Sequence, residues 1–191
     1  MLLGAVASGL VIGSGSAQSE EPFKADLDKL RESLTKYQDV YTAVREGYFS
    51  TVGCVYYNGE KMEGHMEYPK GAMGIHFINT ALIGPTPDPM RPPILIYEPS
   101  GKELRLVAVE WFVPLATGVK KRPELFGQQF QGPMEGHVPL LPLDFTHWDL
   151  HAWLFKENPL GVFAPTNPDV KCDGYDFSLL EHPTKLVPEP Q

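Results

Sequence analysis

Glycine and proline divide this chain into short segments. It has 18 glycines and 19 prolines in 191 residues, which argues against a bundle of long helices because proline breaks helices and glycine weakens them. Many of the intervening runs are rich in β-branched and aromatic residues, a composition that favours strands. The hydrophobic fraction of 42% is too high for a disordered chain. We expect strands at residues 49–57, 74–79, 93–98, 104–113 and 145–155.

Two of these runs are joined by a turn signature. Pro99, Ser100, Gly101 and Lys102 separate the third run from the fourth, and such residues are typical of tight turns between antiparallel strands. The run at 145–155 is ambiguous, because Asp144 and Asn158-Pro159 could also cap and end a helix there. Its tryptophans, phenylalanines and threonine favour the strand.

One segment has the periodicity of a helix. Between residue 26 and Gly47 the apolar residues recur at alternating spacings of three and four, which places them on one helix face. Gly47 suits the left-handed position that ends many helices. We therefore predict a β-rich α+β fold in one domain, residues 18–191, whose antiparallel sheet or barrel packs against an N-terminal amphipathic helix at 26–46. The apolar positions are Leu27, Leu30, Leu34, Tyr37, Tyr41 and Val44.

The N-terminus is typical of an export signal. Residues 2–12 form an uncharged apolar run, followed by small residues up to Ala17, the order found in secretory signal peptides. The run is shorter than the ~20 residues that a membrane-spanning helix needs. We expect a signal peptide at 1–17, a periplasmic or secreted protein and no stable membrane span. A disordered tail or a retained anchor near the lipid is the alternative.

Cys54 and Cys172 are the only two cysteines. Their wide spacing is neither that of a metal knuckle nor that of a redox pair. In an exported protein they would most simply form one disulfide. The chain-entropy model gives it about 4–5 kcal/mol of stabilisation as an upper figure. In a reducing compartment they would be two buried thiols instead.

The charge balance bears on the partners. The formal net charge is −8 and no segment is a dense lysine and arginine cluster. Nucleic acids and anionic membrane surfaces bind basic patches. A nucleic-acid partner is therefore not expected. The partner that we expect is a small-molecule ligand or substrate.

The run at 145–155 carries two of the six histidines. If it is a strand, then His147, Asp149 and His151 lie on one face, and residues two apart can meet at one ion. If it is a helix, then His147 and His151 become neighbours. His151 belongs to the plausible pairs in both cases.

Further candidates lie in the other apolar runs. His76 follows Gly71 and Gly74, and glycine in or beside a strand often lets another group approach the backbone closely. Glu110 interrupts LVAVEWFV, where both strand faces look buried, and a buried carboxylate needs a cation, a proton or a partner such as Arg105. Glu98 follows the apolar ILIY run.

Histidines and carboxylates from different strands can hold a divalent transition metal such as Zn, Fe, Mn or Cu. The main hypothesis is an extracytoplasmic metal-binding protein, with a mononuclear metal oxidoreductase as its more specific form. No contiguous metal motif such as HExxH supports it. The candidate ligands are His76, Glu110, His151, Asp149, Glu98 and His147.

Other functions stay open. The chain could be a binding protein for a small apolar ligand, or a structural envelope protein. Glu98 and Glu110 could also face each other across the hairpin, as a glycoside-hydrolysing pair would. His137 lies in a loop and is expected in solvent, and His65 and His182 are expected at the surface.

Three blocks carry a resemblance: GAMGIHFIN, ILIYEPSGKELRLVAVEWFVP and DLHAWLFKENPLGVFAPTNPDVKC. Over roughly residues 40–172 the chain resembles a family of exported bacterial proteins of unknown function. The resemblance implies export, and it implies a cysteine shortly after the helix and another at the end of the region, where Cys54 and Cys172 stand. It implies no activity and no catalytic residue.

Overall fold

The computed structural model describes residues 23–191. The expected signal peptide at 1–17 lies outside them. All five predicted strands form, the first with the predicted ends and the others with shifted ends, and the run at 145–155 is a strand only at its centre. The strands are β1 (Phe49–Tyr57), β2 (Gly71–Ile78), β3 (Ile94–Ser100), β4 (Glu103–Pro114), β5 (Glu124–Leu125), β6 (Gln128–Gln129), β7 (Gln131–Met134), β8 (His147–Ala152) and β9 (Ser178–Leu180).

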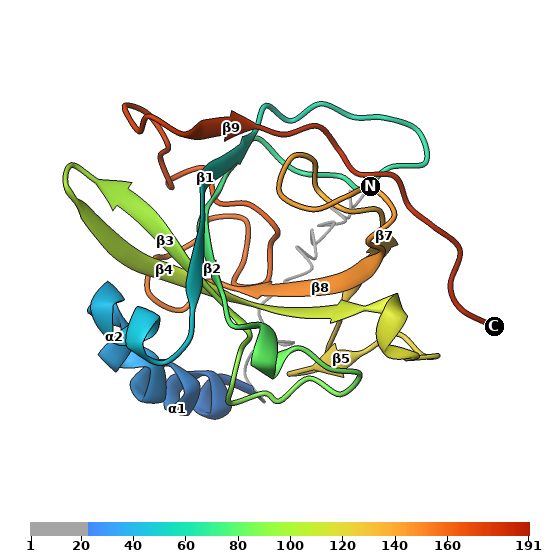
Figure 1. Cartoon of the computed structure of the whole chain (residues 1–191), viewed down its shortest axis with the longest axis horizontal. Coiled ribbons are helices and arrows are strands. Elements are labelled where there is room, and N and C mark those ends of the chain that lie inside the picture. Colours follow the sequence, from blue (N-terminus) through green and yellow to red (C-terminus); the bar gives the residue numbers. More distant parts are fainter. Residues whose placement is uncertain (1–22) are drawn as a thin grey trace, which may run out of the picture.

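Seven of the strands form one curled sheet in the order β7-β8-β4-β3-β2-β1-β9, and β5 pairs with β6 separately. The sheet bends into a half-barrel (Figure 1). The hairpin of β3 and β4 forms around Gly101, which adopts a positive φ of 63°. The expectation of an antiparallel sheet is wrong at one edge, because β9 runs parallel to β1. The chain reaches that edge through a long irregular stretch after β8, so no tight turn imposes an antiparallel direction.

The prediction of one continuous helix at 26–46 is also wrong. The segment folds as α1 (Lys24–Leu34), a 3-10 turn η2 (Thr35–Gln38) and α2 (Val40–Arg45). Asp39 breaks the helix, since its backbone is extended and its side chain accepts a hydrogen bond from the Tyr41 amide. Leu30 is buried, whereas Tyr41 is 72% exposed, so only the first half of the apolar face enters the core.

Both faces of the sheet are covered. One face packs with α1 and η2 into the main hydrophobic core, which includes Leu30, Ile75 and Trp111. α1 and α2 lie together below the sheet (Figure 1). The concave face carries a smaller apolar cluster with Val55 and Met73, and it also carries the polar side chains described below. A polar side chain on either face of β4 between Leu106 and Pro114 is therefore buried.

Cys54 and Cys172 form a disulfide with a Cα–Cα distance of 5.6 Å across a sequence separation of 118 residues. It ties β1 to the segment that leads into β9. Gly71 and Gly74 allow the close approach that the sequence indicates. A Cβ atom on Gly71 would lie 2.8 Å from the carbonyl oxygen of Asn167, and one on Gly74 would lie 2.7 Å from that of Tyr97.

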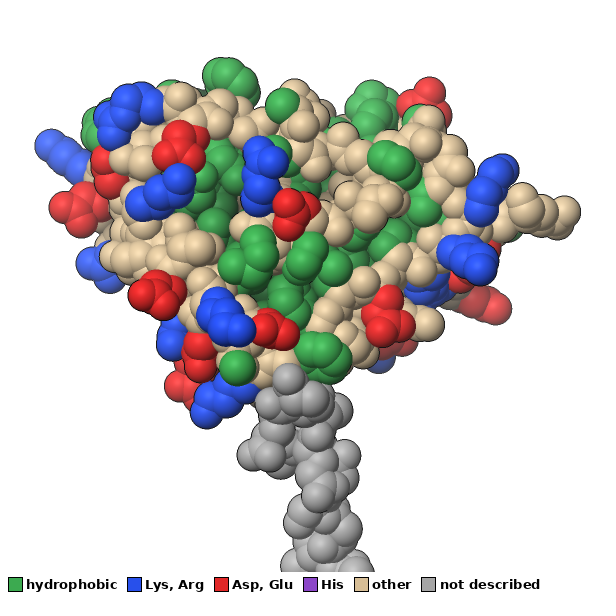
Figure 2. All heavy atoms as spheres, turned by 90° about the horizontal axis from the view of Figure 1, so that it is seen from below, with side chains coloured by type: hydrophobic (Ala, Val, Ile, Leu, Met, Phe, Trp, Pro, Cys, Tyr) green, Lys and Arg blue, Asp and Glu red, His purple; other side chains and the backbone are tan. Residues whose placement is uncertain are grey.

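Within residues 23–191, the structure contains no helix of the length and hydropathy needed to cross a membrane. The surface seen in Figure 2 intersperses acidic and basic side chains among exposed hydrophobic ones, without a basic cluster on that face.

Candidate metal centre

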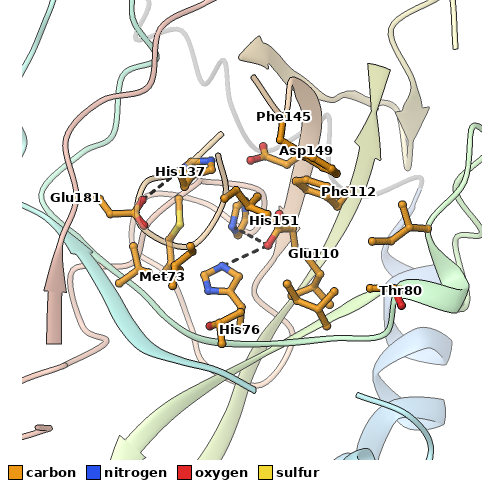
Figure 3. Close-up of a pocket in the computed structure, with 17 residues that line it drawn as sticks. Met73, His76, Thr80, Glu110, Phe112, His137, Phe145, Asp149, His151 and Glu181 are labelled. Atoms are coloured by element: carbon orange, nitrogen blue, oxygen red, sulfur yellow. Dashed lines mark hydrogen bonds and ion pairs between the residues drawn. The ribbon is translucent and has the colours of Figure 1, made fainter. Parts of the chain in front are cut away.

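Strands β2, β4 and β8 place the first group of candidate ligands. Glu110 on β4 is the direct cross-strand partner of His151 on β8. His76 comes from β2, which is separated from β4 by β3. The curl of the sheet brings these side chains together, so that Nε2 of His76 lies 3.3 Å and Nε2 of His151 lies 3.7 Å from Oε2 of Glu110 (Figure 3).

Strand alternation sets the direction of the side chains on β8. Asp149 and His151 line the cavity on the concave face. Trp148, Leu150 and Ala152 occupy the alternate positions and belong to the main core. The sequence expectation that histidine and aspartate share one face of this strand is therefore correct.

These three residues are buried and short of hydrogen bonds. Glu110 is 4%, His151 1% and His76 9% exposed. Oε2 of Glu110, Nδ1 of His76 and both ring nitrogens of His151 have no hydrogen-bond partner. Unpaired buried polar atoms are rare because each costs about 1–3 kcal/mol. Two of these atoms, Oε2 of Glu110 and Nε2 of His151, lie 3.7 Å apart, which makes the group a candidate ligand-binding site.

Burial and mutual attraction set the protonation of this group. Burial raises the pKa of Glu110, but attraction to His151 and His76 outweighs it and brings the pKa down to about 2. Burial lowers the pKa of His151 to about 4, and Glu110 offsets this only in part. Near neutral pH the group therefore offers a carboxylate and a neutral imidazole, which are the forms that bind metal ions.

A second group lies beside the first. His137, His147 and Asp149 each offer one ligand atom, and these atoms lie within 4.8 Å of one another, as do those of His76, Glu110 and His151. Burial, with repulsion from His137, lowers the pKa of His147 to about 3. Burial and the charge of Glu110 raise the pKa of Asp149 well above its usual value.

His137 and Glu181 are site residues that the sequence did not reveal. His137 was expected in solvent, but its loop folds over the concave face and its side chain is only 12% exposed. Nδ1 of His137 lies 3.0 Å from Oε2 of Glu181, which also accepts a 2.6 Å hydrogen bond from the Tyr57 hydroxyl. Glu181 directly follows β9. No local pattern indicates either residue, because both positions depend on long-range packing.

One cavity of about 160 Å³ is lined by every member of the two groups except His147. Its walls are largely apolar, and Figure 3 shows Phe112, Phe145 and Met73 around the polar side chains. In the described part of the chain no lysine or arginine lines this cavity, although Glu110, Asp149 and Glu181 do. The cavity therefore lacks a fixed cationic side chain beside its carboxyl groups.

Glu98 does not join either group, and this corrects its place among the candidate ligands. Both of its carboxylate oxygens lie 2.8 Å from Nζ of Lys156, and Oε1 also accepts a hydrogen bond from the Lys171 amide. In the hairpin Glu98 stands opposite Arg105, while Glu110 stands opposite Ile94. The glycosidase-like pairing of Glu98 with Glu110 is therefore wrong, and Arg105 is not the partner of Glu110.

The remaining histidines lie elsewhere. His182 is exposed and pairs with Glu60 at 2.8 Å, as expected of a surface group. His65 is half-buried, and its ring contacts the carbonyl of Glu63 in its own loop. Neither belongs to the cavity.

No protein-family model, curated protein or solved structure matches this chain.

Proposed function

We propose that this chain is an extracytoplasmic protein that binds a divalent transition metal through His76, Glu110 and His151. The observation that carries the proposal is the convergence of buried ligand atoms, of which Oε2 of Glu110 and Nε2 of His151 have no hydrogen-bond partner. Four ligands at 2.0–2.1 Å around a tetrahedral ion are about 3.3 Å apart. The 3.3 Å and 3.7 Å contacts to Oε2 of Glu110 are close to that spacing.

The electrostatics of the cavity support the same proposal. A buried carboxylate is costly without a positive partner, and no lysine or arginine of residues 23–191 lines the cavity. A divalent cation supplies that charge. Three protein ligands also leave a position on the ion for water or a substrate.

The metals Zn, Fe, Mn and Cu differ in the donor atoms that they prefer. Two imidazoles and one carboxylate suit zinc, and they are also the donor set of non-haem iron oxygenases. A mononuclear oxidoreductase is the more specific form of the proposal. The disulfide between Cys54 and Cys172 supports the extracytoplasmic location, because such bonds persist in oxidising compartments.

Metal analysis tests the proposal. Purified mature protein is dialysed against Zn²⁺, Mn²⁺, Cu²⁺ or, without oxygen, Fe²⁺, and bound metal is counted by mass spectrometry. The wild type should retain at least one of these ions, and His76→Ala, Glu110→Gln and His151→Ala should each bind one ion fewer. The matched control is His182→Ala, which removes an exposed imidazole and should change nothing. A wild type that binds none of the four ions would overturn the proposal.

The apolar wall of the cavity favours a second candidate, the binding of a small apolar ligand. An apolar cavity of about 150 Å³ can hold a molecule the size of benzene, and this cavity has a similar volume of about 160 Å³. A thermal-shift screen of small aromatic compounds in chelator tests this candidate. Stabilisation that rises with ligand concentration supports it, and no shift with any compound counts against it.

A further inference from the structure

The second group of buried side chains has features of a metal site in its own right. Its members are His137 from the loop that precedes β8, and His147 and Asp149 from β8 itself. His147 is 0% and Asp149 is 2% exposed. Nε2 of His147 and Oδ1 of Asp149 have no hydrogen-bond partner. The site proposed above uses none of these three residues.

Both histidine rings of this group are held from their far side. Nδ1 of His147 lies 3.2 Å from the carbonyl oxygen of Phe145, and Nδ1 of His137 lies 3.0 Å from Oε2 of Glu181. An oxygen acceptor at Nδ1 favours the proton on that nitrogen, which leaves Nε2 of a neutral ring with a free electron pair. Metal-binding histidines are oriented in the same way by carboxylates and carbonyls.

The acceptor for His137 is itself fixed. The hydroxyl of Tyr57 on β1 donates a 2.6 Å hydrogen bond to Oε2 of Glu181. Glu181 is 4% exposed and its backbone amide donates to the carbonyl of Tyr56, so it is anchored to β1. Figure 3 shows Glu181 and His137 facing each other across the cavity from Glu110. The carboxylate of Glu181, which is held against β1, thus positions the ring of His137 in its loop.

Asp149 lies between His147 and His151 on one face of β8, so this strand contributes to both groups. His137 and Asp149 line the same cavity as His76, Glu110 and His151. Oε2 of Glu110 accepts no hydrogen bond, and Oδ1 of Asp149 accepts none either. Glu110 and Asp149 therefore belong to two neighbouring donor sets, each of which contains two histidines.

We infer that His137, His147 and Asp149 bind a second divalent transition metal ion, so that the cavity holds two ions side by side. Glu181 acts as the positioning residue that orients His137. The inference goes beyond the proposed function, since it needs residues that the first site does not use. A cavity with two ions would bind small molecules through an oxygen or nitrogen atom and pack their apolar part against Phe112 and Phe145.

Cobalt titration separates the two sites. Co²⁺ gives visible absorption bands whose intensity reports the geometry of each bound ion, and mass spectrometry counts the ions after dialysis. The wild type should bind two Co²⁺ ions. His151→Gln should keep only the second ion and His147→Gln only the first, with different residual spectra. The exposed control His182→Ala should bind two.

Each deviation has a distinct meaning. One ion in the wild type, lost in His151→Gln and kept in His147→Gln, overturns this inference and leaves the proposed function intact. If the wild type binds one ion that is lost in His147→Gln and kept in His151→Gln, the second site stands and the first site, on which the proposed function rests, is overturned. Two ions that both persist in His147→Gln also overturn the inference. No bound ion overturns both.

Two variants that change the side-chain shape less test the second site with less risk of misfolding. Asp149→Asn keeps the shape of the side chain and should remove the second ion alone. Glu181→Gln should weaken the second ion by about 10–100-fold, the usual effect of losing an orienting carboxylate, and leave the affinity of the first within twofold. If both variants keep native circular dichroism and bind both ions with wild-type affinity, the second site is absent.

Discussion

Glu110 and His151 stand directly opposite each other on β4 and β8, with Nε2 of the imidazole 3.7 Å from Oε2 of the carboxylate. Both side chains are buried, and burial holds the pKa of His151 at about 4. Near neutral pH the imidazole is therefore uncharged, while Glu110 is ionised because the neighbouring histidines hold its pKa at about 2. The pair is a buried carboxylate beside a neutral imidazole, and the first prediction follows from it.

Replacement of Glu110 by glutamine should weaken both metal binding and the metal-free fold. Glu110→Gln removes the anionic ligand, so the affinity for the first ion should fall by about 100-fold or more. The metal-free protein should also become less stable by about 1 kcal/mol at pH 7, because the lowered pKa of Glu110, about 2 against 4.5 for a free carboxyl, means that folding favours the ionised carboxylate. Isothermal titration with Zn²⁺ and urea unfolding in chelator measure the two effects. A metal-free variant that is clearly more stable than the wild type would mean that the surrounding histidines do not offset the burial of this charge.

A change at Glu98 should affect stability but not metal binding. Glu98 and Lys156 form a partly buried ion pair outside the cavity. Glu98→Gln should lower the free energy of unfolding by about 1 kcal/mol, since it also weakens the acceptor for the Lys171 amide. Metal stoichiometry and affinity should be unchanged. A loss of bound metal in this variant would contradict the assignment of Glu98 to a structural ion pair.

The sequence predicted the strands well because their signal is local. β1 to β4 contain many β-branched and aromatic residues and are bounded by turn residues, whereas β8 contains only Trp148 of these classes and was the ambiguous run. The same locality explains the error at the helix. The apolar spacing continues through Tyr41 and Val44, but the extended backbone of Asp39 redirects the chain, and both residues are substantially exposed.

The candidate site was partly predictable for the same reason. Glu110 was recognised because a carboxylate in an apolar run is anomalous, and Asp149 and His151 because strand alternation puts them on one face. The geometry that unites them with His76 depends on the curl of the sheet across β3, which no local pattern encodes. His137 and Glu181 escaped prediction because a loop and the parallel edge strand bring them in.

The pH dependence of the metal-free protein should reflect its buried histidines. The pKa of His151 falls to about 4 and that of His147 to about 3, both from 6.5. Below about pH 6.5 the unfolded chain therefore takes up protons that the folded chain refuses. The free energy of unfolding should decrease as the pH falls from 7 to 5, by up to about 1.4 kcal/mol per pH unit for each histidine. Urea unfolding in chelator across this range measures it.

Asp149 opposes this trend and provides the control. Its raised pKa means that the folded protein keeps a proton that the unfolded chain releases above about pH 4, so this group lowers stability as the pH rises. Asp149→Asn removes that contribution. The metal-free variant should be more stable than the wild type at pH 7 and lose stability more steeply on acidification. An unchanged slope would show that Asp149 is ionised in the folded state.

The disulfide should support the second ion as well as the fold. The double variant Cys54→Ala/Cys172→Ala should lower the free energy of unfolding by about 2–5 kcal/mol. The bond anchors the segment that leads into β9, and Glu181 follows that strand. The affinity for the second ion should therefore fall more than that for the first, as measured by Co²⁺ titration of the folded variant. An equal loss at both sites would mean that the anchor does not act through Glu181.

Gly74 lies two residues before His76 on β2, and its replacement should disturb the fold through a defined clash. Gly74 has a φ of +110°, and an added Cβ would lie 2.7 Å from the carbonyl oxygen of Tyr97 on β3. Gly74→Ala should therefore cost more than about 2 kcal/mol, because backbone strain and the contact with β3 add. Gly101→Ala is the matched control, since Gly101 also has a positive φ of +63° but nothing within 4 Å of the new methyl group. It should cost about 1 kcal/mol. Urea unfolding of both variants compares them, and equal losses would exclude close packing of β3 on Gly74 as the reason for glycine at that position.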